Sequence, residues 1–199
     1  MKKYRTLDII SATLFQTELN LKKDYLSFFK KLKYKRSNIP RRTGISVEQN
    51  LFQKYPKELK ELKKEITISL KEVIKNYYMY DCDFRITNSW ATVANSFEGS
   101  EMHIHSNSWL TGCYYPQGNN TISVENVNNS SFLGDPKEYN LYNSKGFDLT
   151  THKNTLLIFP SHLYHRIPAE DLNGKTRHSF ALNVLPKGDF GVEDSKVNF

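Results

Sequence analysis

The pattern of apolar residues changes at Phe84, and this change limits the folds open to the chain. Before Phe84, apolar side chains recur at three- and four-residue steps among many lysines, which is the spacing of amphipathic helices. After it, short apolar runs alternate with clusters of Asn, Gly, Ser and Pro, which is typical of strands joined by turns. The sequence therefore predicts a mainly β fold with N-terminal helices.

Two N-terminal helices are expected, over residues 17–34 and 56–79. In the second, Pro56 suits the first helical turn, where its missing N–H costs nothing. Its apolar stripe comprises Leu59, Leu62, Ile66, Leu70, Val73 and Tyr77. Because lysines occupy the opposite face, we expect this helix to pack on the back of a sheet.

Seven strands are expected in the second part, over residues 84–94, 101–106, 109–116, 121–126, 154–159, 163–168 and 176–186. Several short strands with turn signals between them favour a sandwich or a jelly roll. The stretch 127–147 is rich in Asn, Ser, Gly and Tyr and indicates a long loop, which in compact domains is often a lid or a binding loop. At 199 residues we expect one domain (1–199), with a helical support region (1–80) and a β core (84–186).

The chain is basic, with 28 Lys and Arg against 21 Asp and Glu and a net charge of +7. Much of the excess lies in the first 75 residues and is read as solvated helix faces, the alternative being a site for an acidic partner or nucleic acid. Two cysteines without a C-x-x-C pair make a disulfide framework or a structural zinc site a poor fit. No apolar run follows the N-terminus or is long enough to span a bilayer, so we expect a cytoplasmic protein and no membrane partner.

Three histidines of the second part form a candidate metal site. His103 and His105 are two positions apart, so on a strand both point to one face, and His165 can close the site from about sixty residues later. Iron(II) in oxygenases typically takes two histidines and one carboxylate on one face, with the opposite face open. Here His105 stands where an acid is usual, so the third ligand is His105, an acid such as Glu101 or Asp148, or water.

A second group of residues suits an anion beside the metal. In the run from Arg177, period 2 places Arg177, Ser179 and Asn183 on one face of a strand and apolar side chains on the other. A guanidinium can hold a carboxylate with two parallel hydrogen bonds, to which a serine hydroxyl adds a third. Tyr115 is a further candidate for the same carboxylate, with Tyr114 as its rival.

These residues together resemble a known family. The pattern consists of Ser89-Trp90, Gly99, His103-x-His105-x-x-Ser108-x-x-x-Gly112-x-Tyr114-Tyr115, then Phe159-Pro160-Ser161-x-x-x-His165, and finally Arg177-x-Ser179-x-x-x-Asn183. It is similar to a family of 2-oxoglutarate- and iron(II)-dependent oxygenases found in bacteria and in tailed phages, including cyanophages, which is related to the prolyl hydroxylases. The resemblance covers residues 84–186 well. If the protein is encoded by a phage, we expect it in the cytoplasm of the infected host.

The resemblance implies a fold, cofactors and roles. The fold is a double-stranded β-helix, a jelly roll of cupin type, with helices packed on the major sheet. The implied iron ligands are His103 and His165, with His105 as the third because His-x-His recurs in the family. Arg177, Ser179, Tyr115 and Asn183 are expected to bind 2-oxoglutarate, which reacts with O2 to give succinate and CO2 while a C–H bond is hydroxylated. The substrate expected by analogy is a protein or peptide side chain such as proline.

Two other functions stay open from the sequence. A three-histidine dioxygenase of cupin type would use His105 as a true ligand and no 2-oxoglutarate, which leaves Arg177 and Ser179 unexplained. A non-enzymatic β-sandwich module would instead use the basic helical half to bind an acidic partner.

Overall fold

Two main antiparallel sheets, a two-stranded ribbon and a layer of helices make up the chain in this computed structural model, which describes residues 13–126, 136–140 and 143–198. The large sheet has the strand order β1-β8-β5-β10-β4-β3-β2 and the small sheet has the order β7-β6-β9. The strands of the large sheet are β1 (Phe15–Glu18), β2 (Tyr34–Lys35), β3 (Gly44–Ser46), β4 (Asp83–Ala94), β5 (Leu110–Tyr115), β8 (Thr155–Pro160) and β10 (Arg177–Lys187). The small sheet comprises β6 (Asn120–Glu125), β7 (Gly146–Thr151) and β9 (His165–Arg166), and β11 (Asp189–Phe190) pairs with β12 (Val197–Asn198) near the C-terminus.

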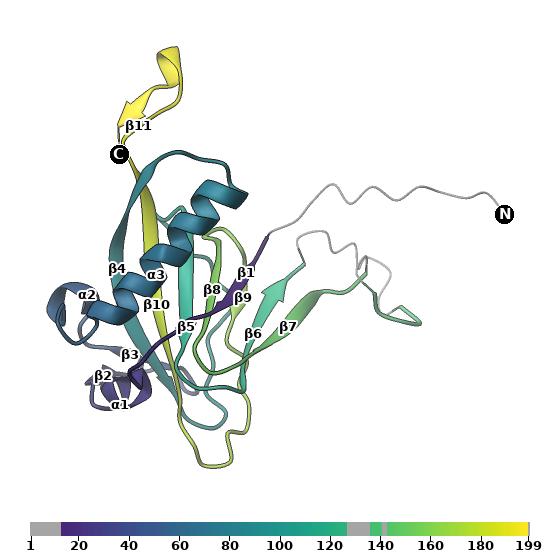
Figure 1. Cartoon of the computed structure of the whole chain (residues 1–199). Coiled ribbons are helices and arrows are strands. Elements are labelled where there is room, and N and C mark those ends of the chain that lie inside the picture. Colours follow the sequence, from purple (N-terminus) through teal and green to yellow (C-terminus); the bar gives the residue numbers. More distant parts are fainter. Residues whose placement is uncertain (1–12, 127–135, 141–142, 199) are drawn as a thin grey trace.

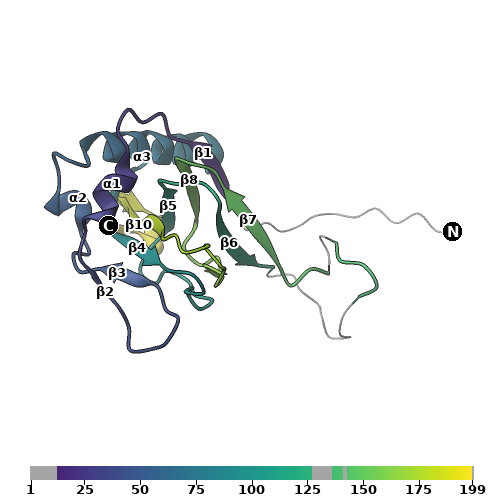
Figure 2. The same ribbon diagram turned by 90° about the horizontal axis from the view of Figure 1, so that it is seen from below.

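The helices cover one face of the large sheet. They are α1 (Tyr25–Lys30), α2 (Leu51–Lys54) and α3 (Lys60–Glu72), which continues as a π-helical turn (Val73–Tyr77), while a 3-10 turn (Glu193–Ser195) lies near the C-terminus. Figure 1 shows α3 running across the sheet, and Figure 2 shows the helices on one side of it with β6 and β7 on the other. Leu62, Ile66 and Leu70 of α3 are fully buried, as the apolar stripe predicts. The expected mainly β fold with helices packed on the major sheet is confirmed.

The large sheet separates two apolar clusters, and β10 contributes to both. Phe180, Leu182 and Val184 pack in the cluster under the helices, whereas Ala181 packs in the cluster between the two sheets. Alternation along the strand sends successive side chains to opposite faces. The face that carries Arg177, Ser179 and Asn183 therefore looks into the space between the sheets, where a site can be built.

The N-terminal region departs from expectation. The helix expected over 17–34 is wrong: its first residues form β1, which pairs with β8, and only Tyr25–Lys30 is helical. Asp24 caps α1 by accepting hydrogen bonds from the Leu26 amide and the Ser27 hydroxyl. Because β1 satisfies the backbone groups along the edge of β8, sheet pairing overrides the local helical pattern there. The region 1–80 thus supplies three strands to the large sheet as well as helices.

Two further differences concern the β core. The strand expected over 101–106 does not form; its backbone makes a single bridge, between His103 and His165. Strand β7 was not expected, and it pairs with β6 along its whole length. Most of the candidate lid 127–147 lies outside the described residues. No helix among the described residues is both long and apolar enough to cross a membrane.

Candidate metal centre and co-substrate pocket

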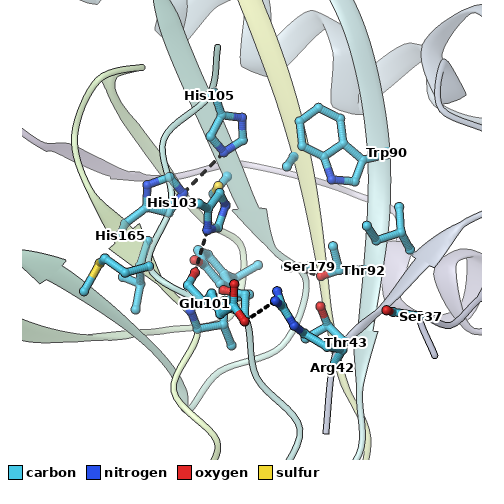
Figure 3. A pocket seen from close by; sticks show the side chains of 18 of the residues that line it. Ser37, Arg42, Thr43, Trp90, Thr92, Glu101, His103, His105, His165 and Ser179 are labelled. Atoms are coloured by element: carbon cyan, nitrogen blue, oxygen red, sulfur yellow. Dashed lines mark hydrogen bonds and ion pairs between the residues drawn. The ribbon is translucent and has the colours of Figure 1, made fainter. Parts of the chain in front are cut away.

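The three candidate histidines lie together between the sheets (Figure 3). His103 and His165 exchange two backbone hydrogen bonds, from His103 N to His165 O at 2.9 Å and from His165 N to His103 O at 3.0 Å. The His105 amide donates to the Ser161 carbonyl at 2.9 Å. Main-chain pairing with the segment around β9, rather than a regular strand, therefore aims these side chains.

Each histidine uses its Nδ1 atom to bond to the protein. Nδ1 of His103 lies 2.8 Å from the Glu101 carbonyl, and Nδ1 of His165 lies 2.8 Å from the Leu163 carbonyl. Nδ1 of His105 lies 2.8 Å from Oδ1 of Asn183. All three partners are oxygen acceptors, so Nδ1 carries the proton and each neutral ring presents the lone pair of Nε2.

These free nitrogens converge in a way that suits a cation. One ligand atom from each ring lies within 4.8 Å of the others, and Nε2 of His105 lies 3.3 Å from Nε2 of His165. With both Nδ1 atoms protonated, neither Nε2 has a proton to donate, so two lone pairs face each other. A metal with ligand bonds of about 2.1 Å would separate adjacent ligands by about 3 Å. The donor set therefore fits a transition metal such as iron(II).

Burial favours the neutral form of the His105 and His165 rings. Burial lowers the pKa of His165 to about 4, and nearby His103 and His105 act in the same direction. The pKa of His105 is also lowered, again mainly by burial. Neutral imidazole is the form that binds a metal, so the surroundings favour the ligand state.

The acids considered as third ligands lie elsewhere. The Glu101 carboxylate forms an ion pair with Arg42, and Asp148 is on the exposed face of β7. Among the described residues, the cluster that could hold a metal contains the three histidines and no carboxylate. The geometry thus brings His103, His105 and His165 together and leaves Glu101 and Asp148 outside.

A cavity of about 400 Å³ opens beside the histidines. Its lining includes Trp90 and Thr92 of β4, Tyr115 of β5, and Ser179 of β10. Three adjacent strands of the large sheet, β5, β10 and β4, therefore contribute to it. The Trp90 ring stacks on the His105 ring with centroids 5.5 Å apart. Cys113 also lines the cavity, and burial raises the pKa of its thiol to about 12, so it is not a thiolate nucleophile.

The candidate carboxylate-binding residues lie on the inner face of the large sheet. The Tyr115 hydroxyl has no hydrogen-bond partner among the described residues, and Ser179 Oγ lies 2.6 Å from Thr92 Oγ1. Arg177 is buried and ion-paired with Glu170 at 3.3 Å, and it donates to the Pro168 carbonyl at 3.2 Å. Burial raises the pKa of the Tyr115 hydroxyl well above its usual value, and the charge of Arg177 lowers this pKa by a smaller amount. The charge of Arg177 thus reaches the Tyr115 phenol although Arg177 itself does not line the cavity, while Tyr114 faces the helices instead.

Comparison with known proteins decides the class of this site. A family model described as "Putative 2OG-Fe(II) oxygenase" matches residues 88–183, which include all three histidines and Arg177. The chain is a 2OG-Fe(II) oxygenase. Iron(II), 2-oxoglutarate and O2 are the cofactors of this class. None of the curated proteins compared with the chain matches it in sequence.

Solved structures share the fold of this 2OG-Fe(II) oxygenase at low identity. HygX from Streptomyces hygroscopicus, with nickel and 2-oxoglutarate bound, has a TM-score of 0.59 at 10% identity over 87% of this chain and 82% of its own. A prolyl hydroxylase from Trichoplax adhaerens, in complex with a peptide fragment of hypoxia inducible factor, has a TM-score of 0.59 at 13% identity over 88% and 84%. The epimerase SnoN from nogalamycin biosynthesis reaches 0.65 at 9% identity over 90% and 81%. The expected double-stranded β-helix is confirmed.

Asn183 has a different place in the 2OG-Fe(II) oxygenase from the one its strand face suggested. Its side chain accepts from His105 and does not line the cavity. The register of β10 against β4 shifts between Asn183 and Val184, where Thr87 of β4 is the extra residue. Such an irregularity re-aims nearby side chains. Asn183 therefore contacts a candidate ligand rather than the space for the co-substrate.

Arg42 is the pocket residue that the sequence reading missed. It follows the loop of residues 37–41, lines the cavity and pairs with Glu101 (Figure 3). The Arg41-Arg42 pair was visible as local charge, but its approach to the metal site depends on a long-range bridge between Arg42 and Gly99. Of the other histidines, His162 is exposed and His178 is on the helical side of β10.

Proposed function

We propose that this oxygenase hydroxylates a C–H bond of a protein side chain, with His103, His105 and His165 as the iron ligands. The observation that carries the proposal is the convergence of three unprotonated Nε2 atoms at the mouth of the cavity. Bound iron(II) would supply the activation of O2, with 2-oxoglutarate converted to succinate and CO2 as one oxygen atom enters the substrate. A ligand set without a carboxylate suits a dianionic co-substrate, because the ion and the co-substrate then balance in charge.

Three residues would hold the co-substrate. Arg177 is a buried cation, and the Tyr115 hydroxyl beside it is a protonated donor without a partner in the described residues. Ser179 offers a hydroxyl on the same strand face, two residues from Arg177. Together they would orient one carboxylate of 2-oxoglutarate so that its other end reaches the metal. The apolar inner walls would exclude water from the reacting atoms.

The substrate class is supported by likeness alone. The prolyl hydroxylase from Trichoplax adhaerens is similar in fold and was solved with a peptide, while HygX was solved with hygromycin B, a small molecule. A peptide side chain such as proline is the substrate we propose for this chain.

Anaerobic titration of iron(II) and 2-oxoglutarate tests the metal and co-substrate assignment. A weak visible charge-transfer band is expected in the wild type, and it should be absent in His165→Ala and Arg177→Ala. Circular dichroism of both variants controls for folding. A folded wild-type protein without the band would contradict the assignment, as would a band that persists in either variant.

The three-histidine ligand set also favours a second candidate, a dioxygenase that does not use 2-oxoglutarate. Oxygen uptake with a thiol substrate in the absence of 2-oxoglutarate would support it. The Tyr115 hydroxyl argues against it, because such a reaction gives this donor, which has no partner among the described residues, no anion to bind.

A further inference from the structure

A second cavity continues from the iron pocket to the surface. It has a volume of about 250 Å³ and shares five lining residues with the first, namely Ile39, Arg42, Ser100, Glu101 and Ile167. Its other lining comes from the loop before β3, from the segment around Gly99, and from the residues after β9. A molecule that reaches the histidines therefore has room to extend beyond them along this groove, which comprises residues 39–42, 99–101 and 166–169.

The groove carries uncompensated positive charge. Arg41, Arg42 and Arg166 line it against a single acid, Glu101. Glu101 is ion-paired with Arg42, while Arg41 and Arg166 are exposed and have no ion pair among the described residues. Two free guanidinium groups beside a catalytic pocket attract an anionic substrate and hold carboxylates through paired hydrogen bonds.

Backbone hydrogen bonds join the chain segments that carry these arginines before any substrate binds. Gly99 N donates to the Arg41 carbonyl at 2.9 Å, and Ser100 N donates to the Ile167 carbonyl at 2.9 Å, so three chain segments are joined. A Cβ atom at Gly99 would lie 2.5 Å from the Ile167 carbonyl oxygen, so this close approach requires glycine. Arg41 has a φ of 60°, an unfavourable value for arginine, which indicates that the surroundings impose its conformation. A preformed groove lowers the ordering cost of binding.

The remaining lining distinguishes a peptide from a nucleic acid. Ile39, Pro40, Pro168 and Ala169 give the groove aliphatic walls, and its described lining contains no aromatic side chain. Single-stranded nucleic acid is normally held by aromatic rings on which the bases stack. Aliphatic walls with separated arginines fit an extended polypeptide that carries Asp or Glu. We propose that the substrate is an acidic polypeptide segment, whose target side chain enters the iron pocket while flanking carboxylates pair with Arg41 and Arg166.

This inference rests on the proposed function, and binding can test it apart from turnover. The probe is a fluorescein-labelled peptide of eight glutamates, titrated anaerobically with the full-length protein loaded with iron(II) and 2-oxoglutarate. Fluorescence anisotropy is read at about 50 mM and about 300 mM NaCl, because salt screens exposed charges. The charge-transfer band of each sample reports separately whether metal and co-substrate are bound.

The variants are chosen to change charge at constant fold. Arg41→Asn with Arg166→Gln should weaken binding about tenfold at low salt, since two exposed ion pairs are lost. Asn tolerates the positive φ at position 41. Glu101→Gln should tighten binding, because it removes the acid and frees Arg42, while its carbonyl still accepts from His103. Lys60→Gln with Lys64→Gln, which removes two exposed charges from α3, should leave binding unchanged.

Three results would overturn the inference while the band is present. The first is equal binding of an eight-residue lysine peptide. The second is tighter binding of an eight-residue thymidine oligonucleotide, which would point to nucleic acid. The third is an equal loss in the groove and α3 variants, which would indicate non-specific charge attraction. A missing band in the wild type would instead contradict the proposed function.

Discussion

At the scale of single residues, the site depends on the hydrogen bonds that Nδ1 of His103, His105 and His165 makes with the protein. Two of the three acceptors are backbone carbonyls, which no substitution removes, whereas the third is the side chain of Asn183. His105 is therefore the one histidine of the three whose orientation a mutation can release. Outer hydrogen-bond partners of this kind fix the tautomer and the ring orientation of metal ligands.

We expect Asn183→Ala to lower iron(II) affinity by about tenfold to 100-fold, because the His105 ring loses its acceptor. Isothermal titration of the anaerobic protein measures the change. Asn88→Ala is a matched control, since Asn88 pairs with Asn183 across β4 and β10, and its Oδ1 accepts from Thr87 rather than from any histidine among the described residues. Equal loss in both variants would mean a general effect on the strand pair.

Tyr115→Phe should raise the KM for 2-oxoglutarate by about tenfold, the effect of one hydrogen bond to a charged group. Stability should hardly change, because the hydroxyl has no partner among the described residues and the ring is retained. Tyr114→Phe should leave this KM unchanged and lower the stability by about 1 kcal/mol, because it removes the hydrogen bond to Asn154 Oδ1 at 2.9 Å. Steady-state kinetics measure the KM for 2-oxoglutarate of the two variants, and thermal melts measure their stability. Unchanged KM in Tyr115→Phe would remove Tyr115 from the co-substrate site.

At the scale of elements, β10 carries two functions on its two faces. One face carries Arg177 and Ser179, of which Ser179 lines the pocket. The other face packs His178 under the helices, where Nδ1 lies 3.4 Å from the Tyr34 hydroxyl and Nε2 lies 3.3 Å from Thr176 Oγ1. Burial lowers the pKa of His178 from 6.5 to about 4, with a smaller contribution from Lys30. The folded state thus holds this ring neutral in a pH range where the unfolded chain protonates it.

His178 should therefore make the metal-free protein sensitive to acid. The contribution of His178 to the free energy of unfolding is fully present above pH 6.5 and is lost as the pH falls from 6.5 toward 4, because the unfolded state then binds the proton more readily. The shift corresponds to at most about 3 kcal/mol. The free energy of unfolding depends on the titration of His105 and His165 in the same way. In His178→Gln it should therefore still fall with decreasing pH, but less steeply than in the wild type. Urea unfolding at several pH values measures this, and parallel declines would contradict it.

The elements also show which parts of the molecule a sequence pattern can predict. Strands β4, β5, β8 and β10 are found close to their expected bounds, because alternation and burial on both faces leave a strong local signal. The helix expected over 17–34 includes the last two residues of β1, because only the pairing of β1 with β8 makes this segment extended. The same limit applies to the site. His103, His105 and His165 were identified from spacing, but the partnership of Asn183 with His105 and the approach of Arg42 depend on a register shift and a long-range bridge.

At the scale of the whole molecule, the site joins the two sheets. The residues around it come from β4, β5 and β10 of the large sheet and from β6 and β9 of the small sheet. Ligands that bind here should therefore stabilise both layers together. Iron(II) with 2-oxoglutarate at about 100 times the dissociation constant should add about 2.7 kcal/mol to the free energy of unfolding. Thermal melts with and without ligands measure the shift, and His165→Ala should abolish it.

The hydrogen bonds between His103 and His165 also bear on the lifetime of the protein. Those two bonds join the segment between β4 and β5 to β9, and a metal held by the same residues would tie that segment down a second time. Without the ion, we expect residues 95–109 to open more often and to be cut first by a protease. In a cell short of iron, the enzyme would then be degraded sooner as well as inactive, so its abundance would follow the supply of the metal it uses.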